Sequence, residues 1–419
     1  MLFAPAIVVA QQTATDFYNQ GVAQLDNGYQ EEAIADFNKA IALDPKNVNA
    51  YVSRGNAKRD DGDTEGAIAD YNQAIALDPK NVTAYVNRGI AKRSDREGAI
   101  ADYTQVIALD PKNVTAYLNR GLAKMSKADP DGAIADYTQV IALDPKNANA
   151  YRTRGLAKYA KGDFDGAIAD YTQVIALDPK NANAYVNRGN AKQDKGDADG
   201  AIADYTQVIA LDPKNVLAYL NRGLAKMSKG NADGAMTDFN PAIVLDPKYA
   251  DVYFDRAAAK QVKGDLPGAL ADYNQEISLA NPAAVLLGYG HFNSWLVQMQ
   301  MNQAAAASQQ LSAYMSAHPG SAIGDWPSKI GGFLLGQINE TDFLAAAASP
   351  DPKQDQAQHS EAWYYAGMQH FVAGDKITAA DDFRKCLAAS AKNNTLANEK
   401  DRPQIFLAHA ELKALGQAP

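Results

Sequence analysis

The chain has 419 residues, one cysteine and a formal net charge of −9. This acidic balance argues against nucleic acids and anionic membrane surfaces as partners, because both are bound by basic surfaces. The lone cysteine, Cys386, excludes a disulfide within the chain and a cysteine-rich metal site.

The first ten residues, MLFAPAIVVA, are apolar. They are too few to span a membrane, but they match the hydrophobic part and the small-residue cleavage site of a secretory signal peptide, although a basic segment is missing. We therefore expect residues 1–12 to be a signal-peptide remnant and the protein to lie in the periplasm, the cell envelope or outside the cell. The alternative is a chance apolar tail on a cytoplasmic protein.

A tandem repeat with a period of 34 residues occupies residues 14–282. The segment GAIADYTQVIALDPKN occurs four times without change, and the tetrad LDPK occurs seven times. A period of this length with helical patterning is typical of an α-solenoid, in which each helical hairpin buries its apolar face against its neighbours. Such a chain presents an extended surface, and we expect its function to lie there.

Each period is predicted to form two helices with large and small residues at fixed positions. In the second repeat these are Tyr51 at position four, Gly55 at eight, Ala67 at twenty and Tyr71 at twenty-four. The pattern is similar to the tetratricopeptide repeat (TPR) family. This resemblance implies an all-α fold, a right-handed solenoid of eight TPR hairpins.

Turn residues separate the predicted helices. Gly62 and its equivalents close the first helix of most repeats, and Asp63 caps the second. Asp44 and Pro45 are predicted to begin the next helix, as its N-cap and its first residue. Repeat three lacks two residues in its inner turn, and Pro241 lies inside a second helix, where we expect it to bend the solenoid.

In TPR arrays the first helices line the concave face, and here their sixth position always carries a small hydrogen-bonding side chain. These residues are Asn19, Ser53, Asn87, Asn119, Thr153, Asn187, Asn221 and Asp255. A carboxamide both donates and accepts hydrogen bonds, as the main chain of a peptide requires. The row resembles the asparagine ladder of protein O-GlcNAc transferases, which implies binding of extended polypeptide; no glycosyltransferase domain follows it. The alternative is that the amides cap neighbouring helices or are only solvated.

Other positions of the first helices add apolar side chains and an arginine beside this row. The candidate lining residues are Leu118, Leu122, Arg152, Tyr159, Leu220 and Leu224. Apolar residues repeated on an exposed face indicate a binding surface. The alternative is that these side chains pack between adjacent first helices.

Position seven is arginine in seven repeats, and position twenty-three of the same repeats is aspartate. We expect Arg54 to pair with Asp70, and likewise along the array, because a half-buried arginine without a carboxylate is costly. A basic row for acidic ligands is the less favoured interpretation. The dicarboxylate clamp of chaperone-binding TPR domains does not carry over, since it needs Lys and Asn where Tyr18 and Val22 stand.

Residues 283–419 are predicted to form degenerate helical hairpins, a further TPR-like hairpin at 360–390 and a capping helix at 403–415. Cys386 occupies a slot that alanine or valine fills in the repeats, which indicates core packing rather than a reactive thiol. Solenoids need an atypical end of this kind to cover their last apolar face.

Roughly the last 95 residues resemble bacterial envelope TPR proteins of the NlpI lipoprotein type. The shared features include Trp326-Pro327 and Gly374-Asp375. The resemblance implies an envelope adaptor that brings cell-wall peptidases to a processing protease. This chain departs from that family by lacking the lipidated cysteine and by carrying a longer repeat array.

No catalytic residue, metal site or cofactor is predicted. The five histidines follow the repeats, and none stands at metal-ligand spacing with another histidine or a cysteine. No phosphate-binding glycine loop, nucleophile elbow or HExxH motif is present. Asp381-Asp382 is interpreted as a solvated helix face.

Three hypotheses remain. We favour a non-catalytic scaffold or adaptor that binds other proteins or peptide segments, envelope enzymes among them. The second is a structural homo-oligomer that associates through its N-terminal hairpin. The third, and weakest, is a hydrolase or modifying enzyme seated in the C-terminal part.

Overall fold

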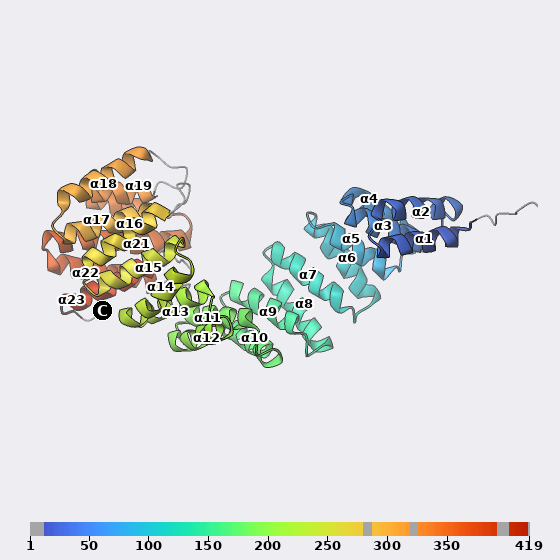
Figure 1. The fold of residues 1–419 in the computed structure, drawn as a ribbon, viewed down its shortest axis with the longest axis horizontal. Helices are drawn as coiled ribbons and strands as arrows, with labels where there is room; N and C mark the ends of the chain where they lie inside the picture. Colours follow the sequence, from blue (N-terminus) through green and yellow to red (C-terminus); the bar gives the residue numbers. More distant parts are fainter. Residues whose placement is uncertain (1–11, 280–286, 319–325, 392–401, 418–419) are drawn as a thin grey trace, which may run out of the picture. The chain divides into compact units, whose positions relative to one another are not determined.

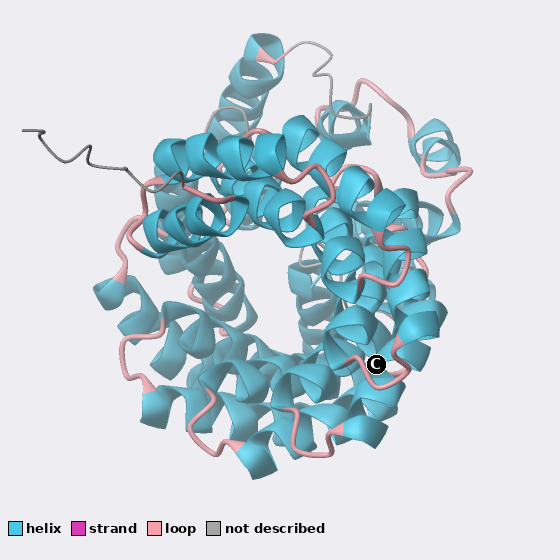
Figure 2. Ribbon diagram, turned by 90° about the vertical axis from the view of Figure 1, so that its right-hand side faces the viewer, coloured by secondary structure: helices cyan, strands magenta, loops and turns pink. Residues whose placement is uncertain are grey.

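In the computed structural model, residues 12–279, 287–318, 326–391 and 402–417 are described. They form 23 helices and contain no strand, in agreement with the predicted all-α solenoid of hairpins (Figure 2). The predicted signal-peptide remnant lies outside the described residues, apart from Gln12. None of the described helices is long and apolar enough to cross a membrane.

The chain forms two compact units, residues 1–177 and 178–419. Unit 1 contains five helical hairpins, in which odd-numbered helices are the first and even-numbered helices the second of each repeat (Figure 1). Its helices are α1 (Ala14–Asp26), α2 (Gln30–Leu43), α3 (Val48–Asp60), α4 (Thr64–Leu77), α5 (Val82–Ala91), α6 (Arg96–Leu109), α7 (Val114–Ser126), α8 (Pro130–Leu143), α9 (Ala148–Ala160) and α10 (Phe164–Leu177).

Unit 2 contains three further repeats and a C-terminal module. The repeats are α11 (Ala182–Lys195), α12 (Ala198–Leu211), α13 (Val216–Ser228), α14 (Ala232–Leu245), α15 (Ala250–Val262) and α16 (Leu266–Leu279). The module is α17 (Leu287–Gln300), α18 (Ala304–Ala317), α19 (Trp326–Leu334), α20 (Glu340–Ala346), α21 (Pro352–Ala373), α22 (Lys376–Ala391) and α23 (Arg402–Ala414).

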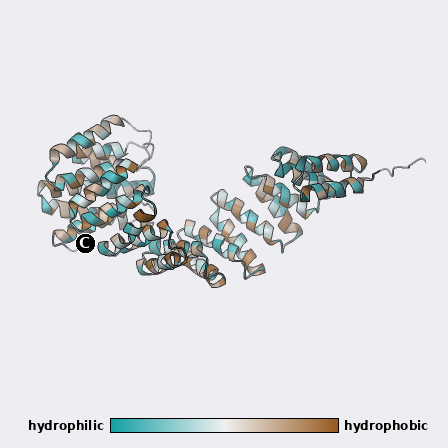
Figure 3. Cartoon of the chain, in the orientation of Figure 1, coloured by the Kyte–Doolittle hydropathy of each residue, from teal (hydrophilic) through white to brown (hydrophobic). Residues whose placement is uncertain are grey.

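The hairpins close because glycine on the first helix faces an aromatic ring on the second. A Cβ placed on Gly121 of α7 would lie only 2.6 Å from Cε1 of Tyr137 on α8, so a larger residue would push the helices apart. Tyr137 and Ala133 are fully buried, and their equivalents in the other repeats of unit 1 are at most 5 % exposed. Each helix therefore carries both hydrophobic and hydrophilic residues (Figure 3).

The helix ends follow the predicted turn chemistry in part. Gly62 adopts a positive φ of 94°, and the side chain of Asp63 accepts a hydrogen bond from the amide of Gly66 at 2.8 Å. The prediction that Asp44 and Pro45 begin the next helix is wrong. Asn47 is the N-cap of α3. Asp44 instead ends α2, and its carboxylate accepts a hydrogen bond from the amide of Lys46 in the turn that precedes α3.

The two expected irregularities have different outcomes. Helix α5 has 10 residues where the other first helices of unit 1 have 13, so the deletion in repeat three shortens the first helix. Pro241, in contrast, does not interrupt α14, which keeps the 14 residues of the other second helices. Proline removes one hydrogen bond there without ending the helix.

The C-terminal module has its own hydrophobic core. The predicted TPR-like hairpin is formed by α21 and α22, where a Cβ on Gly367 would lie 2.8 Å from Cε1 of Phe383. Cys386 is fully buried in the same core, as predicted for a packing residue. The last helix, α23, packs against α22 and also against α15, a first helix of the repeats.

Candidate functional site

The arginine row is paired within the hairpins. Arg154 of α9 donates from Nε and Nη2 to the two carboxylate oxygens of Asp170 on α10, at 2.9 and 2.7 Å. The same geometry joins Arg54 to Asp70, and the arginine stacks over the aromatic ring three residues before it. The predicted pairing is confirmed, and the guanidinium groups are not free for acidic ligands.

A lysine joins each arginine–aspartate pair to form a cluster of three charged residues. The sequence analysis did not predict this lysine. Lys158 Nζ lies 2.9 Å from Oδ2 of Asp170, and a lysine in the same position serves every aspartate from Asp70 to Asp272. The signal was present, because each lysine follows its arginine by one helical turn. Two cations around one buried carboxylate make these clusters structural.

The asparagine row lies on the first helices, but its members differ in what they offer. Asn19 is exposed, and Asn119, Asn187 and Asn221 are half-buried; none of these four side chains makes a hydrogen bond to another described residue. Asn87 donates to Oδ1 of Asn56 at 2.8 Å. The row therefore contains carboxamides with unused hydrogen-bonding capacity.

The other members of the row are less available. The hydroxyl of Thr153 donates to the carbonyl oxygen of Asn149 at 2.8 Å and is buried. Ser53 and Asp255 are half-buried. The row is thus interrupted at Thr153, which belongs to α9.

The apolar lining residues separate into an exposed and a buried group. In unit 1, Leu122 of α7 is 49 % exposed and Leu156 of α9 is 37 % exposed, while Leu118 is half-buried. In unit 2, Leu220 and Leu224 of α13 are only 6 % and 7 % exposed. The two buried leucines belong to the core of unit 2 and are not a free surface.

Two further lining residues lie on α9. The ring of Tyr159 packs edge-on against Phe164 with 5.6 Å between centroids. Arg152 is half-buried and donates from Nη2 to Oδ1 of Asn149 at 2.8 Å. Among the described residues Arg152 has no carboxylate partner, which distinguishes it from the paired arginines.

Comparison with known proteins gives the family. Residues 21–58, 55–93, 91–127, 129–162, 155–196 and 189–230 match the family model described as TPR repeat. The chain is a TPR repeat protein. No curated protein sequence matches it.

Solved structures of TPR proteins cover parts of the chain. The structure of MamA is 32 % identical over 41 % of this chain and 96 % of its own, with a TM-score of 0.39. A tetratricopeptide repeat protein from Parabacteroides merdae is 20 % identical over 59 % of this chain and 98 % of its own, with a TM-score of 0.43. YrrB, described as a TPR protein with an unusual peptide-binding site, is 22 % identical over 43 % and 95 %, with a TM-score of 0.40.

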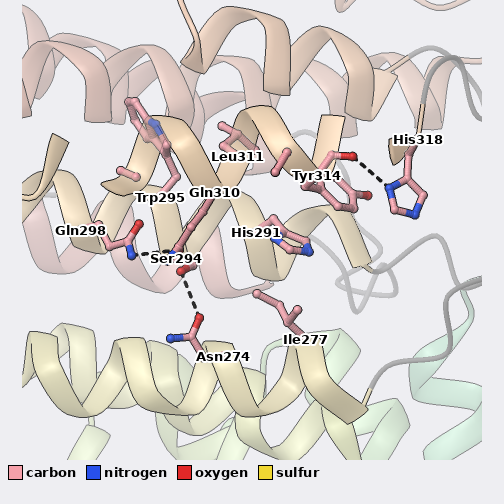
Figure 4. Close-up of a pocket in the computed structure, with 12 residues that line it drawn as sticks. Asn274, Ile277, His291, Ser294, Trp295, Gln298, Gln310, Leu311, Tyr314 and His318 are labelled. Carbon is pink, nitrogen blue, oxygen red and sulfur yellow. Dashed lines mark hydrogen bonds between the residues drawn. The ribbon is translucent and has the colours of Figure 1, made fainter. Parts of the chain in front are cut away.

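Unit 2 of this TPR protein also contains a pocket of about 530 Å³ between α16, α17 and α18 (Figure 4). The ring of His291 stacks on Tyr314 in it, with 4.0 Å between centroids. Burial, and then the proximity of His318, lower the pKa of His291 to about 4, so this imidazole is neutral at physiological pH. No acidic side chain, lysine or arginine is among the pocket's lining residues, and it lies far along the chain from the asparagine row of unit 1.

One histidine of the module lies between two carboxylates. His370 Nδ1 is 2.9 Å from Oδ2 of Asp382, and Nε2 is 3.2 Å from Oε2 of Glu340. The prediction that Asp382 lies on a solvated face is wrong: Asp382 is 1 % exposed because it faces His370 of α21 within the closely packed hairpin of α21 and α22, whereas Asp381 faces solvent.

These three residues could hold a metal ion. Because the carboxylates face opposite nitrogens of the ring, an ion at Nε2 would have Glu340 as its second protein ligand, and Asp382 would orient the imidazole. A structural zinc site needs four protein ligands. The arrangement is better explained as a polar link that joins α20, α21 and α22.

Proposed function

We propose that this TPR protein is a non-catalytic scaffold that binds an extended polypeptide segment of a partner protein. The binding surface is the first-helix face of unit 1, formed by α1, α3, α5, α7 and α9. TPR repeats are protein-interaction modules, and the solenoid brings side chains from successive repeats onto one continuous face.

The observation that supports this proposal is that this face carries carboxamides without hydrogen-bond partners and leucines that are exposed to solvent. The carboxamides of Asn19 and Asn119 make no hydrogen bond to a described residue, and Leu122 is half exposed beside Asn119. A carboxamide that donates and accepts can bind a peptide group without reading its side chain. Exposed leucines add affinity for apolar side chains.

The cellular setting is a proposal as well. The apolar residues 1–10 favour export, and the resemblance of the C-terminal part to NlpI-type proteins favours an envelope adaptor whose partners are cell-wall enzymes. Fractionation of the native host, with detection of the protein in periplasmic and cytoplasmic extracts, tests this setting independently of binding.

The binding surface is tested by cross-linked capture of partners from the native host. One variant combines Asn19→Ala with Asn119→Ala. Its matched control combines Gln105→Ala with Gln139→Ala, which removes two exposed carboxamides from the second helices α6 and α8. We expect the first variant to lose partners and the control to keep them. Partners retained by both variants at wild-type levels would overturn the proposal.

A further inference from the structure

Two first helices of this chain have almost the same sequence but different surroundings. Helix α7 reads VTAYLNRGLAKMS and α13 reads VLAYLNRGLAKMS, so they differ only at Thr115 and Leu217. Nevertheless Leu122 of α7 is 49 % exposed, whereas its equivalent Leu224 of α13 is 7 % exposed. The helix itself cannot cause this difference, so the neighbouring elements must.

The buried cluster that contains Leu224 is packed from outside its own repeat. Leu224 belongs to a buried cluster, and the partly buried side chains packed against that cluster include Val262 of α15 and Phe406 of α23. Helix α23 contributes to both cores, because Leu407 and Leu412 are buried in the C-terminal module while Phe406 packs against the repeat cluster. In unit 2, a helix from outside the repeats thus helps to bury the cluster that contains Leu224.

The equivalent face of α7 has no such cover among the described residues of unit 1. The residue of α9 that corresponds to Val262 is Ala160, which is exposed and too small to cover a leucine. Leu156 of α9 is itself 37 % exposed. We call Leu118, Leu122, Arg152 and Leu156, which lie on the successive first helices α7 and α9, the Leu122 patch.

We propose that the Leu122 patch binds an amphipathic helix of a partner protein. This helix presents an aromatic or large aliphatic side chain to the leucines and a carboxylate to Arg152. The inference rests on the proposed function and refines it, because the partner then contacts the first-helix face in two ways: a helix lies over the Leu122 patch, and an extended stretch follows the asparagine row.

Two arguments select this occupant. The first is the surroundings of the nearly identical helix α13, since the buried cluster that contains Leu224 is packed by an aromatic residue carried on a helix from outside the repeats. A helix brings side chains one turn apart onto one apolar stripe, which is the usual way that a helical groove is filled. The second is charge: Arg152 has no carboxylate partner among the described residues, so an acidic partner residue complements it.

The test uses the full-length protein and a fluorescein-labelled peptide with the sequence of residues 402–417, which carries Phe406 and Glu411. The peptide cannot readily replace α23 in unit 2, because the tethered α23 competes for its own site at a high effective concentration. We expect binding that Leu122→Asp weakens at least tenfold. The control Leu143→Asp changes an exposed leucine at the end of α8 and should alter the dissociation constant less than twofold.

Two further peptides separate the anchors. A peptide with Phe406→Ala should bind at least tenfold more weakly. A peptide with Ala410→Glu, which places a carboxylate one helical turn from Phe406, should bind more tightly to the wild-type protein but not to Arg152→Gln.

Three results would overturn the inference. One is failure of the wild-type protein to bind the peptide. Another is equal binding by Leu122→Asp and Leu143→Asp. The third is self-association of the full chain that Leu122→Asp abolishes, because a second copy would then cover the patch. The proposed function fails separately, through partner capture that does not depend on Asn19 and Asn119.

Discussion

Gly155 of α9 lies against the ring of Tyr171 on α10, so closely that a Cβ on Gly155 would stand 2.8 Å from Cε1 of Tyr171. Tyr171 is 1 % exposed and cannot swing into solvent without opening the hairpin. Repeat eight solves the same contact differently, because Ala257 occupies the glycine position opposite Tyr273 and both are fully buried. A hairpin of this chain therefore accommodates alanine at position eight in one repeat and glycine in the others.

We predict that Gly155→Ala destabilises the array. Helix propensity alone would make alanine better by about 1 kcal/mol, but overpacking of a close contact costs about 1–3 kcal/mol and should prevail. The matched variant Ala257→Gly should also destabilise, by roughly 1 kcal/mol, because it removes contact and adds backbone entropy. Thermal unfolding followed by circular dichroism measures both. A higher midpoint for Gly155→Ala would show that the helices can separate at little cost.

Each buried aspartate is predicted to stabilise its repeat through two cations. Asp170→Asn leaves Arg154 and Lys158 without a carboxylate, which should cost about 3 kcal/mol. The control is Asp131→Asn: the side chain of Asp131 is 75 % exposed and pairs with Lys161, so its loss should cost less than about 0.5 kcal/mol. Hydrogen exchange of the amides of repeat five should report the difference. Equal exchange in the two variants would contradict a structural role for the cluster.

These contacts explain which parts of the structure the sequence predicts. The pairing of Arg54 with Asp70 follows from two residue types repeated at fixed positions, so periodicity places them on facing helices. The lysine of each cluster has the same periodicity and was predictable from it. The N-cap at Asn47 was missed because Asp44-Pro45 is an equally common helix start.

The burial of Asp382 was predictable, because Gly367 and Phe383 stand at positions eight and twenty-four of their hairpin and Asp382 is therefore at position twenty-three, like the buried aspartates of the repeats. Contacts outside the repeat were not predictable. The contact of Phe406 with the repeats depends on where α23 packs, which no local pattern fixes. The exposure of Leu122 and the burial of Leu224 follow from such contacts, so the nearly identical sequences of α7 and α13 could not distinguish them.

Glu276 is predicted to make unit 2 less stable as the pH rises. It occupies position twenty-seven of repeat eight, where the other repeats have buried alanine or valine, and it is 3 % exposed. Burial, with a further contribution from Asp251, raises the pKa of Glu276 to about 8. In the unfolded chain a glutamate ionises near its ordinary pKa of about 4.3.

Between these two pKa values the folded chain holds a proton that the unfolded chain has released, so the free energy of unfolding falls as the pH rises from about 4 to about 8. The loss should reach the order of 5 kcal/mol at most. Glu276→Gln cannot ionise and should remove this part of the pH dependence, with a higher unfolding midpoint than wild type at pH 9 and a similar one at pH 5. Glu31→Gln, an exposed residue of α2, serves as control. Parallel pH profiles for wild type and Glu276→Gln would show that Glu276 is solvated.

The two equivalent leucines provide the most direct comparison of surface and core. Leu224→Ala should destabilise unit 2 by about 2–4 kcal/mol, because it removes buried apolar area and leaves a cavity. Leu122→Ala should cost unit 1 less than about 1 kcal/mol, since half of that side chain is already in contact with water. Hydrogen exchange resolved by repeat measures each effect in its own unit, which avoids treating the solenoid as one two-state transition. Because the two helices are nearly identical, equal losses of protection in α7 and α13 would mean that Leu122 is covered in solution and that the Leu122 patch does not exist as a free surface.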